Sequence, residues 1–267
     1  MRQSVKIKKV IASIEGQLQE KRPSLTINIS NLKARYPCGP NYHDVPNVWE
    51  DLRKFKITGS RLPALLGSHE QEKFIKYWKV VKEGLKESDV INTNFENFKR
   101  GHKFEKEAIS VFCNLSNSKT QTCGFFEDPS DSNYGASPDA LAASSLSLEV
   151  KTRAAKPEGP LTSLKQLPSY YIQPQLEMVC TGASYCILES YHPETQQASF
   201  FLIKRDDVLM SVIKDITNSI LNEKPLLEWS YSENNHYKHL GENVAGRIPD
   251  QTPKITHKCT GKVSSYG

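Results

Sequence analysis

The sequence predicts an α/β protein in which helices flank a mixed central β-sheet. Helix-like and strand-like stretches alternate through the middle of the chain. The segment LSLEVKT at 146–152 alternates apolar and polar residues, as a half-buried strand does. Apolar residues recur at helical spacing at 70–86 and 95–115. With 267 residues, the chain is long enough for one large domain or two small ones.

The other elements follow from spacing and turn residues. Ser60 is a suitable N-cap for a short helix that carries Pro63 in its early turns. Pro174 must lie in the first turn of its helix or bend it. We expect the remaining segments in this order: strands at 120–127 and 133–137, a helix through 170–180, paired strands at 184–192 and 199–205, and a helix at 206–221.

Composition divides the chain into three parts. Residues 1–46 contain several prolines and only short apolar runs, which indicates an N-terminal arm of unknown role. Residues 47–229 hold the expected sheet and helices and form the main domain. Residues 230–267 are polar, so we expect a C-terminal tail that is largely irregular.

Charge is concentrated at the two ends. The net charge is +5, of which residues 1–22 contribute +4 and residues 251–267 contribute +3, leaving −2 for the rest of the chain. A nucleic-acid partner would therefore have to bind a local basic groove rather than the overall field of the protein.

The six cysteines include no CxxC pair, and no histidine pair has metal-finger spacing, so we expect no structural zinc. The N-terminus lacks the apolar run of a signal peptide, and no apolar run has the ~18 residues that span a bilayer. These features favour an intracellular protein, cytoplasmic or nuclear, that is not secreted and has no membrane partner.

Three charged residues lie close together near the strand at 146–152. Within this strand, Glu149 and Lys151 share one face because side chains alternate. Asp139 follows Pro138 and would lie beside them if two strands form a hairpin. Two carboxylates can bind a hard cation, and the ammonium can contact a phosphate. The alternatives are the wet face of an edge strand for Glu149 and Lys151, and an ordinary turn for Asp139.

A fourth candidate lies on the helix at 95–115. Glu105 shares the helical stripe of Ala108, Ile109 and Phe112, whereas Glu107 points outward. A carboxylate on a buried stripe costs several kcal/mol unless a cation or a donor compensates it. A third metal-facing carboxylate would explain Glu105.

Four ordered motifs resemble those of a known family. GASPD at 135–139 followed by LEVK at 148–151 resembles the PD-(D/E)xK nuclease signature, and the remaining motifs resemble its YqaJ or phage lambda exonuclease branch. The resemblance spans about residues 47–221. The other motifs are Trp49-x-x-Leu-Arg53-x4-Ile57-Thr58-Gly59-Ser60, Arg100-Gly-x3-Glu105-x2-Ala108, and Tyr170-x2-Gln173-x-Gln175-x2-Met178-x2-Thr181.

The resemblance implies a role for each matching residue. By this resemblance the catalytic residues are Asp139, Glu149, Lys151 and Gln173, the metal ligands are Glu105, Asp139 and Glu149, and the residues that receive a DNA phosphate are Arg53, Thr58 and Ser60. The cofactor would be Mg²⁺, with Mn²⁺ as a substitute, in a two-ion site. No GxxxxGK[ST] loop is present, so we expect no need for ATP.

Some of these residues have plainer interpretations. Gln173 can be a helix-surface residue, and Gln175 can satisfy a backbone group. Arg53 can be solvated beside Lys54 and Lys56. Arg100 and Arg153 can contact a DNA backbone or form a solvated charged face.

The implied fold is a restriction-endonuclease-like mixed sheet flanked by helices. The implied function is a metal-dependent deoxyribonuclease, a 5′-to-3′ exonuclease on linear double-stranded DNA in recombination or repair. Its expected partners are a single-strand annealing protein and further copies of itself in a trimeric ring. The alternatives are a PD-(D/E)xK endonuclease and a catalytically inactive DNA-binding module.

Overall fold

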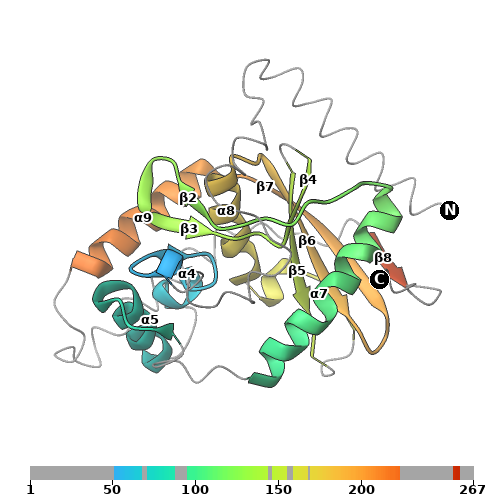
Figure 1. Cartoon of the computed structure of the whole chain (residues 1–267), viewed down its shortest axis with the longest axis horizontal. Helices are drawn as coiled ribbons and strands as arrows, with labels where there is room; N and C mark the ends of the chain where they lie inside the picture. Colours follow the sequence, from blue (N-terminus) through green and yellow to red (C-terminus); the bar gives the residue numbers. More distant parts are fainter. Residues whose placement is uncertain are drawn as a thin grey trace, which may run out of the picture.

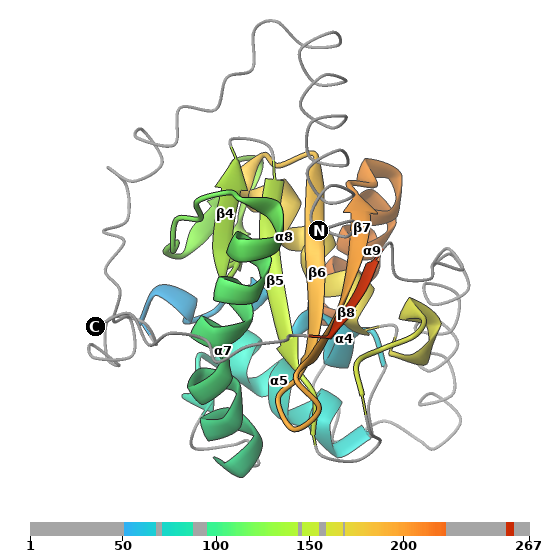
Figure 2. The same ribbon diagram turned by 90° about the vertical axis from the view of Figure 1, so that its right-hand side faces the viewer.

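A five-stranded mixed sheet lies at the centre of the molecule (Figures 1 and 2). The computed structural model describes residues 51–67, 71–87, 95–143, 146–154, 159–167, 169–222 and 255–258. The strand order is β4 (Ala140–Ala143), β5 (Leu146–Thr152), β6 (Tyr185–His192), β7 (Gln197–Lys204) and β8 (Ile255–Lys258). Strands β5 and β6 run parallel, and the other neighbours are antiparallel. The predicted α/β class is confirmed.

A second, three-stranded sheet has the order β1 (Ile57–Thr58), β3 (Asp131–Ala136) and β2 (Phe126–Asp128). Helix α8 (Ser169–Thr181) contacts strands of both sheets. The other helices are α4 (Leu62–Leu65), α5 (Gln71–Glu83), α7 (Phe95–Ser116), the 3₁₀ turn η2 (Leu164–Gln166) and α9 (Asp207–Asn222). None of the helices in these described ranges is both long and apolar enough to cross a membrane.

Strand β5 is buried on both faces. Its Leu148 and Val150 pack with Ala108 and Phe112 of α7. Glu149, on the other face, is only 2% exposed. Because β5 lies between β4 and β6, the edge-strand alternative for its polar face is wrong. Any charge on that face must find its partners inside the protein.

Helix α8 carries Pro174 as its sixth residue, beyond the first turn. Proline removes one backbone donor there. Gln175 fixes the helix to the end of β7: its Nε2 donates to the Lys204 carbonyl at 3.0 Å, and its Oε1 accepts from the Asp206 N–H at 2.8 Å. The interpretation of Gln175 as a residue that satisfies backbone groups is confirmed.

The structure corrects three expectations. Asp139 directly precedes β4, and it is β4, not the earlier strand β3, that pairs with β5. Helix α4 is capped by Arg61 and not by Ser60, whose hydroxyl bonds Arg53 and Thr58 instead. Strand β8 lies within the expected irregular tail and pairs with β7.

The elements set by local periodicity agree well with the sequence. The helices expected at 70–86, 95–115 and 206–221 are α5, α7 and α9, and the hairpin expected at 184–192 and 199–205 is β6 with β7. The strands expected at 120–127 and 133–137 are shorter or shifted, as β2 and β3. The arm 1–46 and Trp49 lie outside the described residues.

Gly135 gives a test of the packing around β3. A methyl group at Gly135 of β3 would overlap the ring of Phe125, which is 1% exposed. We expect Gly135→Ala to destabilise the protein by about 1–3 kcal/mol through overpacking, a fall of roughly 2–12 °C in Tm. The matched control is Gly101→Ala in α7, where a methyl group meets nothing within 4 Å and should add about 0.5–1 kcal/mol of helix stability. Thermal unfolding of both variants checks this, and equal Tm changes would contradict it.

Candidate active site

Glu149, Lys151 and Gln173 form a closed set of polar contacts between β5 and α8. The Lys151 Nζ lies 2.6 Å from Glu149 Oε1 and donates to Gln173 Oε1 at 2.9 Å. The Gln173 Nε2 in turn donates to Glu149 Oε1 at 2.6 Å. These three predicted residues are therefore together, and Gln173 is not a helix-surface glutamine.

Glu177 is a member of this group that the sequence reasoning missed. Gln173 Nε2 also donates to Glu177 Oε1 at 2.8 Å, and Glu177 is 1% exposed. Residues four apart share a helix face, so the spacing from Gln173 is the signal that would have found it. Burial and Glu149 raise the pKa of Glu177 well above its ordinary value.

Asp139 brings a further carboxylate to the same place. Its Oδ2 accepts a hydrogen bond from the Val150 N–H at 2.6 Å, which holds it against β5. Burial raises the pKa of Asp139 well above its ordinary value, and Glu149 and Glu105 raise it further. Partial burial and Glu149 likewise raise the pKa of Glu105, whose side chain on α7 is 34% exposed and therefore less buried than its place on the apolar stripe predicted. The three carboxylates predicted to bind metal therefore act on one another electrostatically.

One cation stands among these acids. Burial lowers the pKa of Lys151, but Glu149 and Asp139 more than offset this and raise it above its ordinary value. Lys151 thus stays an ammonium. A single ammonium cannot neutralise Glu105, Asp139, Glu149 and Glu177 together, so the acids either hold protons or attract further cations.

The donor set suits a hard divalent cation, which prefers carboxylate oxygens. Glu149 Oε2 is buried and has no hydrogen-bond partner among the described residues, which leaves it available as a ligand. Within those residues, however, no three His, Cys, Asp or Glu side chains are already grouped to hold an ion. The reason is visible in the contacts: Asp139 Oδ2 is bonded to Val150, and Glu149 Oε1 to Lys151 and Gln173.

Glu107 behaves differently from Glu105. It does not point outward, as its helical phase suggested: it is half-buried and accepts a hydrogen bond from the Tyr191 hydroxyl at 2.6 Å. Tyr191 belongs to β6, so α7 turns both glutamates toward the sheet at different points. That prediction for Glu107 was wrong because one helix face covers several strands.

Arg53, Thr58 and Ser60 come together as a second polar cluster. The Arg53 Nη2 donates to Thr58 Oγ1 at 3.3 Å and to Ser60 Oγ at 3.0 Å, and the two hydroxyl oxygens are 3.2 Å apart. The Arg53 side chain is 18% exposed. The interpretation of Arg53 as a solvated arginine beside Lys54 and Lys56 is therefore wrong.

Two further residues complete this cluster, and sequence reasoning missed both. Arg61 Nε donates to Glu87 Oε2 at 3.0 Å, and the Glu87 carboxylate also lies 3.5 Å from Arg53 Nη2. Burial alone would raise the pKa of Glu87, but Arg53 and Arg61 hold it below its ordinary value. Two guanidinium groups against one carboxylate leave the cluster with net positive charge.

Gly59 joins the two clusters. A Cβ atom placed on Gly59 would lie 2.9 Å from Gln173 Cγ, so the backbone between Thr58 and Ser60 packs directly on the glutamine of the carboxylate site. Glycine permits this close approach. The arginine–hydroxyl cluster and the carboxylate site are therefore neighbours.

Arg100 and Arg153 meet where α7 begins and β5 ends. Arg100 Nε donates to the Arg153 carbonyl at 3.0 Å, and its Nη2 forms an ion pair with Glu194. Arg100 also lies over the ring of Phe104 at 5.7 Å. These contacts give Arg100 a structural role in addition to any contact with DNA.

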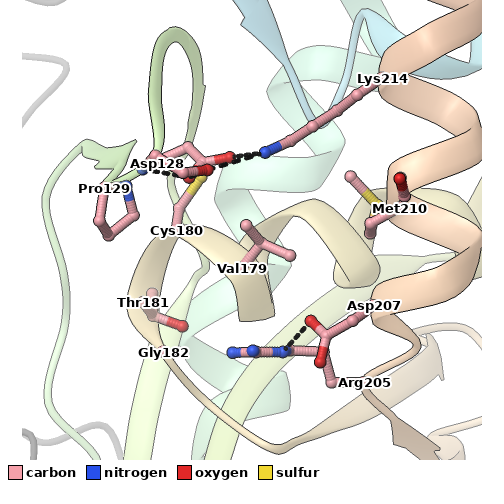
Figure 3. A pocket seen from close by; sticks show the side chains of 12 residues that line it. Asp128, Pro129, Val179, Cys180, Thr181, Gly182, Arg205, Asp207, Met210 and Lys214 are labelled. Carbon is pink, nitrogen blue, oxygen red and sulfur yellow. Dashed lines mark hydrogen bonds and ion pairs between the residues drawn. The ribbon is translucent and has the colours of Figure 1, made fainter.

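A cleft of about 560 Å³ lies elsewhere, beside the C-terminal end of α8 (Figure 3). Lys214 forms an ion pair with Asp128 there, and Arg205 Nε lies 2.7 Å from Asp207 Oδ1. None of the predicted site residues lines it. Because its cations already face carboxylates, the cleft offers no evident site for a phosphate.

Solved exonucleases have a similar fold. An alkaline exonuclease from Laribacter hongkongensis, LHK-Exo, matches with a TM-score of 0.53 and 22% identity over 76% of this chain and 100% of that one. Its complex with dAMP matches with a TM-score of 0.54 and the same identity and coverage. A phage-related exonuclease from Haemophilus somnus 129PT gives a TM-score of 0.50 and 14% identity, covering 73% of this chain and 98% of that one.

The search of curated proteins gives no match. The family model of the YqaJ-like viral recombinase domain matches residues 48–184, which is half of the chain and holds both polar clusters. The order of the motifs, the sheet that carries Glu149 and Lys151, and this match agree. The chain therefore belongs to the family of YqaJ-like viral recombinase domains.

Proposed function

We propose that this protein is a metal-dependent deoxyribonuclease that hydrolyses phosphodiester bonds of double-stranded DNA. The observation that carries the proposal is the group of Glu105, Asp139 and Glu149 around Lys151: Glu149 is 2% exposed, and its charge helps to raise the pKa of both Glu105 and Asp139. Such a group gains stability when a cation binds. It would serve little purpose in a module that only binds DNA.

In this proposal Glu105, Asp139 and Glu149 hold Mg²⁺, with two ions as the expected number. When bound, the metal supplies an activated water and offsets charge on the phosphate oxygens. Lys151 adds an ammonium that stabilises charge developing on the phosphate. Gln173 accepts from Lys151 and donates to Glu149, so it fixes the mutual position of the two.

The adjoining arginine cluster favours an exonuclease. Arg53, Thr58 and Ser60 can bind a terminal phosphate dianion, and Gly59 ties them to Gln173. A DNA end held there would have its nearest phosphodiester close to the carboxylates. We propose that the protein digests DNA from 5′ to 3′ in recombination. The expected partner is a single-strand annealing protein, and the expected assembly is a trimeric ring of copies of this chain.

Linear and closed circular duplex DNA test the function. The protein with Mg²⁺ should degrade only the linear form, and Glu149→Gln or Lys151→Ala should abolish this while circular dichroism stays unchanged. Each change removes a metal or phosphate contact and leaves the Leu148 and Val150 packing under α7 intact. Cleavage of both DNA forms would indicate an endonuclease. Full activity in either variant would refute the site.

Glu105 and Glu107 provide a matched pair for metal binding. Glu105→Gln should weaken Mg²⁺ binding and slow cleavage, because Glu105 is electrostatically coupled to Asp139 and Glu149. Glu107→Gln should affect neither, since its bonded partner is Tyr191. Thermal unfolding with and without Mg²⁺ measures binding, because a ligand of the folded state raises Tm by mass action. Equal losses in both variants would contradict the assignment.

The effect of pH on Tm, measured with and without Mg²⁺, has a predicted direction. Acids whose pKa is raised by folding destabilise the folded state as pH rises above their unfolded pKa, about 4. Asp139, Glu105 and Glu177 are such acids. The metal-free protein should therefore lose stability from this source as pH rises, and the Tm gain from Mg²⁺ should be larger at pH 8 than at pH 6.

Arg53 tests the proposed preference for a 5′ end. The native protein should digest 5′-phosphorylated ends faster than 5′-hydroxyl ends, because a terminal phosphate carries extra charge. Arg53→Ala should remove most of this preference, by about 10- to 150-fold for a charge-assisted contact of roughly 1.5–3 kcal/mol. Lys54→Ala is the control, since Lys54 is exposed and next in sequence. The measurement is the initial digestion rate of duplexes with 5′-phosphate or 5′-hydroxyl ends. An unchanged preference in Arg53→Ala would contradict the assignment of Arg53 to a terminal phosphate.

A further inference from the structure

Glu177 is a buried carboxyl group that bonds to the side chain bridging Glu149 and Lys151. We propose that Glu177 is a positioning residue: it fixes the side-chain amide of Gln173, and through that amide it fixes Lys151. The proposal rests on the nuclease function above for its effect on rate. The position of the amide can be tested without it.

The contacts of Gln173 define one orientation of its amide. Its NH₂ group donates to Glu149 Oε1 at 2.6 Å and Glu177 Oε1 at 2.8 Å, while its Oε1 accepts from Lys151 Nζ at 2.9 Å. A flipped amide would turn its oxygen to two carboxyl groups and its NH₂ to an ammonium. Glu177 supplies one of the two acceptors, so its loss removes one of the two hydrogen bonds that the NH₂ group donates.

Stability alone does not explain a glutamate at this position. Glu177 is 1% exposed, and its Oε2 has no hydrogen-bond partner in the described part of the chain. A buried carboxyl group with an unsatisfied oxygen costs free energy that an apolar side chain of similar volume would not. Helix α8 packs against both sheets, so it holds Glu177 in place relative to β5 and Lys151.

Lys151 depends on this arrangement for its direction. Its Nζ contacts Glu149 and Gln173 and lies 5.6 Å from the ring centre of Tyr170. Gln173 and Tyr170 both belong to α8. A lysine has several rotatable bonds and high rotamer entropy, so an oriented acceptor narrows where its ammonium can lie.

The first test compares two substitutions of Glu177 in the full chain with Mg²⁺ and linear duplex DNA. Glu177→Gln keeps an acceptor for Gln173 and should stay within about threefold of the native kcat. Glu177→Met removes it and should lower kcat at least about 10-fold, with KM for DNA unchanged. Glu189→Met is the control in the NMR measurement and not for kcat, because Asp139 acts electrostatically on Glu189. Glu189 is fully buried, has no hydrogen-bond partner in the described ranges and aligns with Val150, on the face under α7.

A double-mutant cycle separates positioning from a general loss of structure. Gln173→Ala and Gln173→Ala/Glu177→Met should have equal kcat, because Glu177 would act only through Gln173. Independent, multiplying losses would overturn the proposal. A 10-fold loss in Glu177→Gln would overturn it too, and this result does not depend on whether Glu177→Met folds.

The second test measures hydrogen exchange of the Gln173 side-chain amide by NMR and does not depend on nuclease activity. The Gln173 side-chain NH₂ resonances, identified by their loss in Gln173→Ala, should exchange slowly with solvent in the native protein and in Glu189→Met. They should exchange at least 10-fold faster in Glu177→Met. Unchanged exchange would refute the positioning role. An inactive native protein with the expected exchange pattern would refute the nuclease function alone.

Discussion

Burial of charged side chains around strand β5 is the constraint on which the rest of the structure depends. Strand β5 lies between β4 and β6, and its Glu149 and Lys151 side chains are 2% and 21% exposed, so both charges lie largely out of bulk water. Each buried charge then needs a partner within reach. The protein supplies Gln173 from α8, the Val150 N–H for Asp139, and Lys151 for Glu149, yet leaves an excess of acids. That excess is electrostatically costly without metal and is what would give a metal its affinity.

Helix α8 connects the charged group around β5 to both sheets. It contacts both sheets and presents different residues to each neighbour: Gln173 and Glu177 to β5, and Gln175 to the end of β7. The Gln175 bonds hold the helix against sliding along the sheet. A helix fixed at that point keeps the Gln173 amide at a set position relative to β5. Packing of α8 also replaces the stabilisation that the backbone bond lost at Pro174 would give.

Local periodicity in the sequence predicted the parts of the site that lie on one element. Alternation paired Glu149 with Lys151, whereas the role of Gln173 was implied only by the family resemblance. Periodicity did not predict β4, because the segment ALAA has no apolar–polar alternation, and so it missed that β4 pairs with β5 directly after Asp139. It also missed Glu87, whose partners Arg53 and Arg61 lie 34 and 26 residues away, and it misplaced Glu107 because the outer limit of a helix face depends on what packs against it.

The relation between the two clusters follows from a missing side chain. Gly59 lets the backbone that carries Thr58 and Ser60 approach Gln173 more closely than any residue with a Cβ atom would. The backbone of the arginine cluster therefore lies directly against the Gln173 side chain, which bonds to Glu149 and Glu177. Glu87 lowers the net positive charge of that cluster, because its carboxylate forms ion pairs with both Arg53 and Arg61. An anion bound there would be held less tightly than by two unopposed arginines. In the proposed function, this weaker binding would ease release of a DNA end after cleavage.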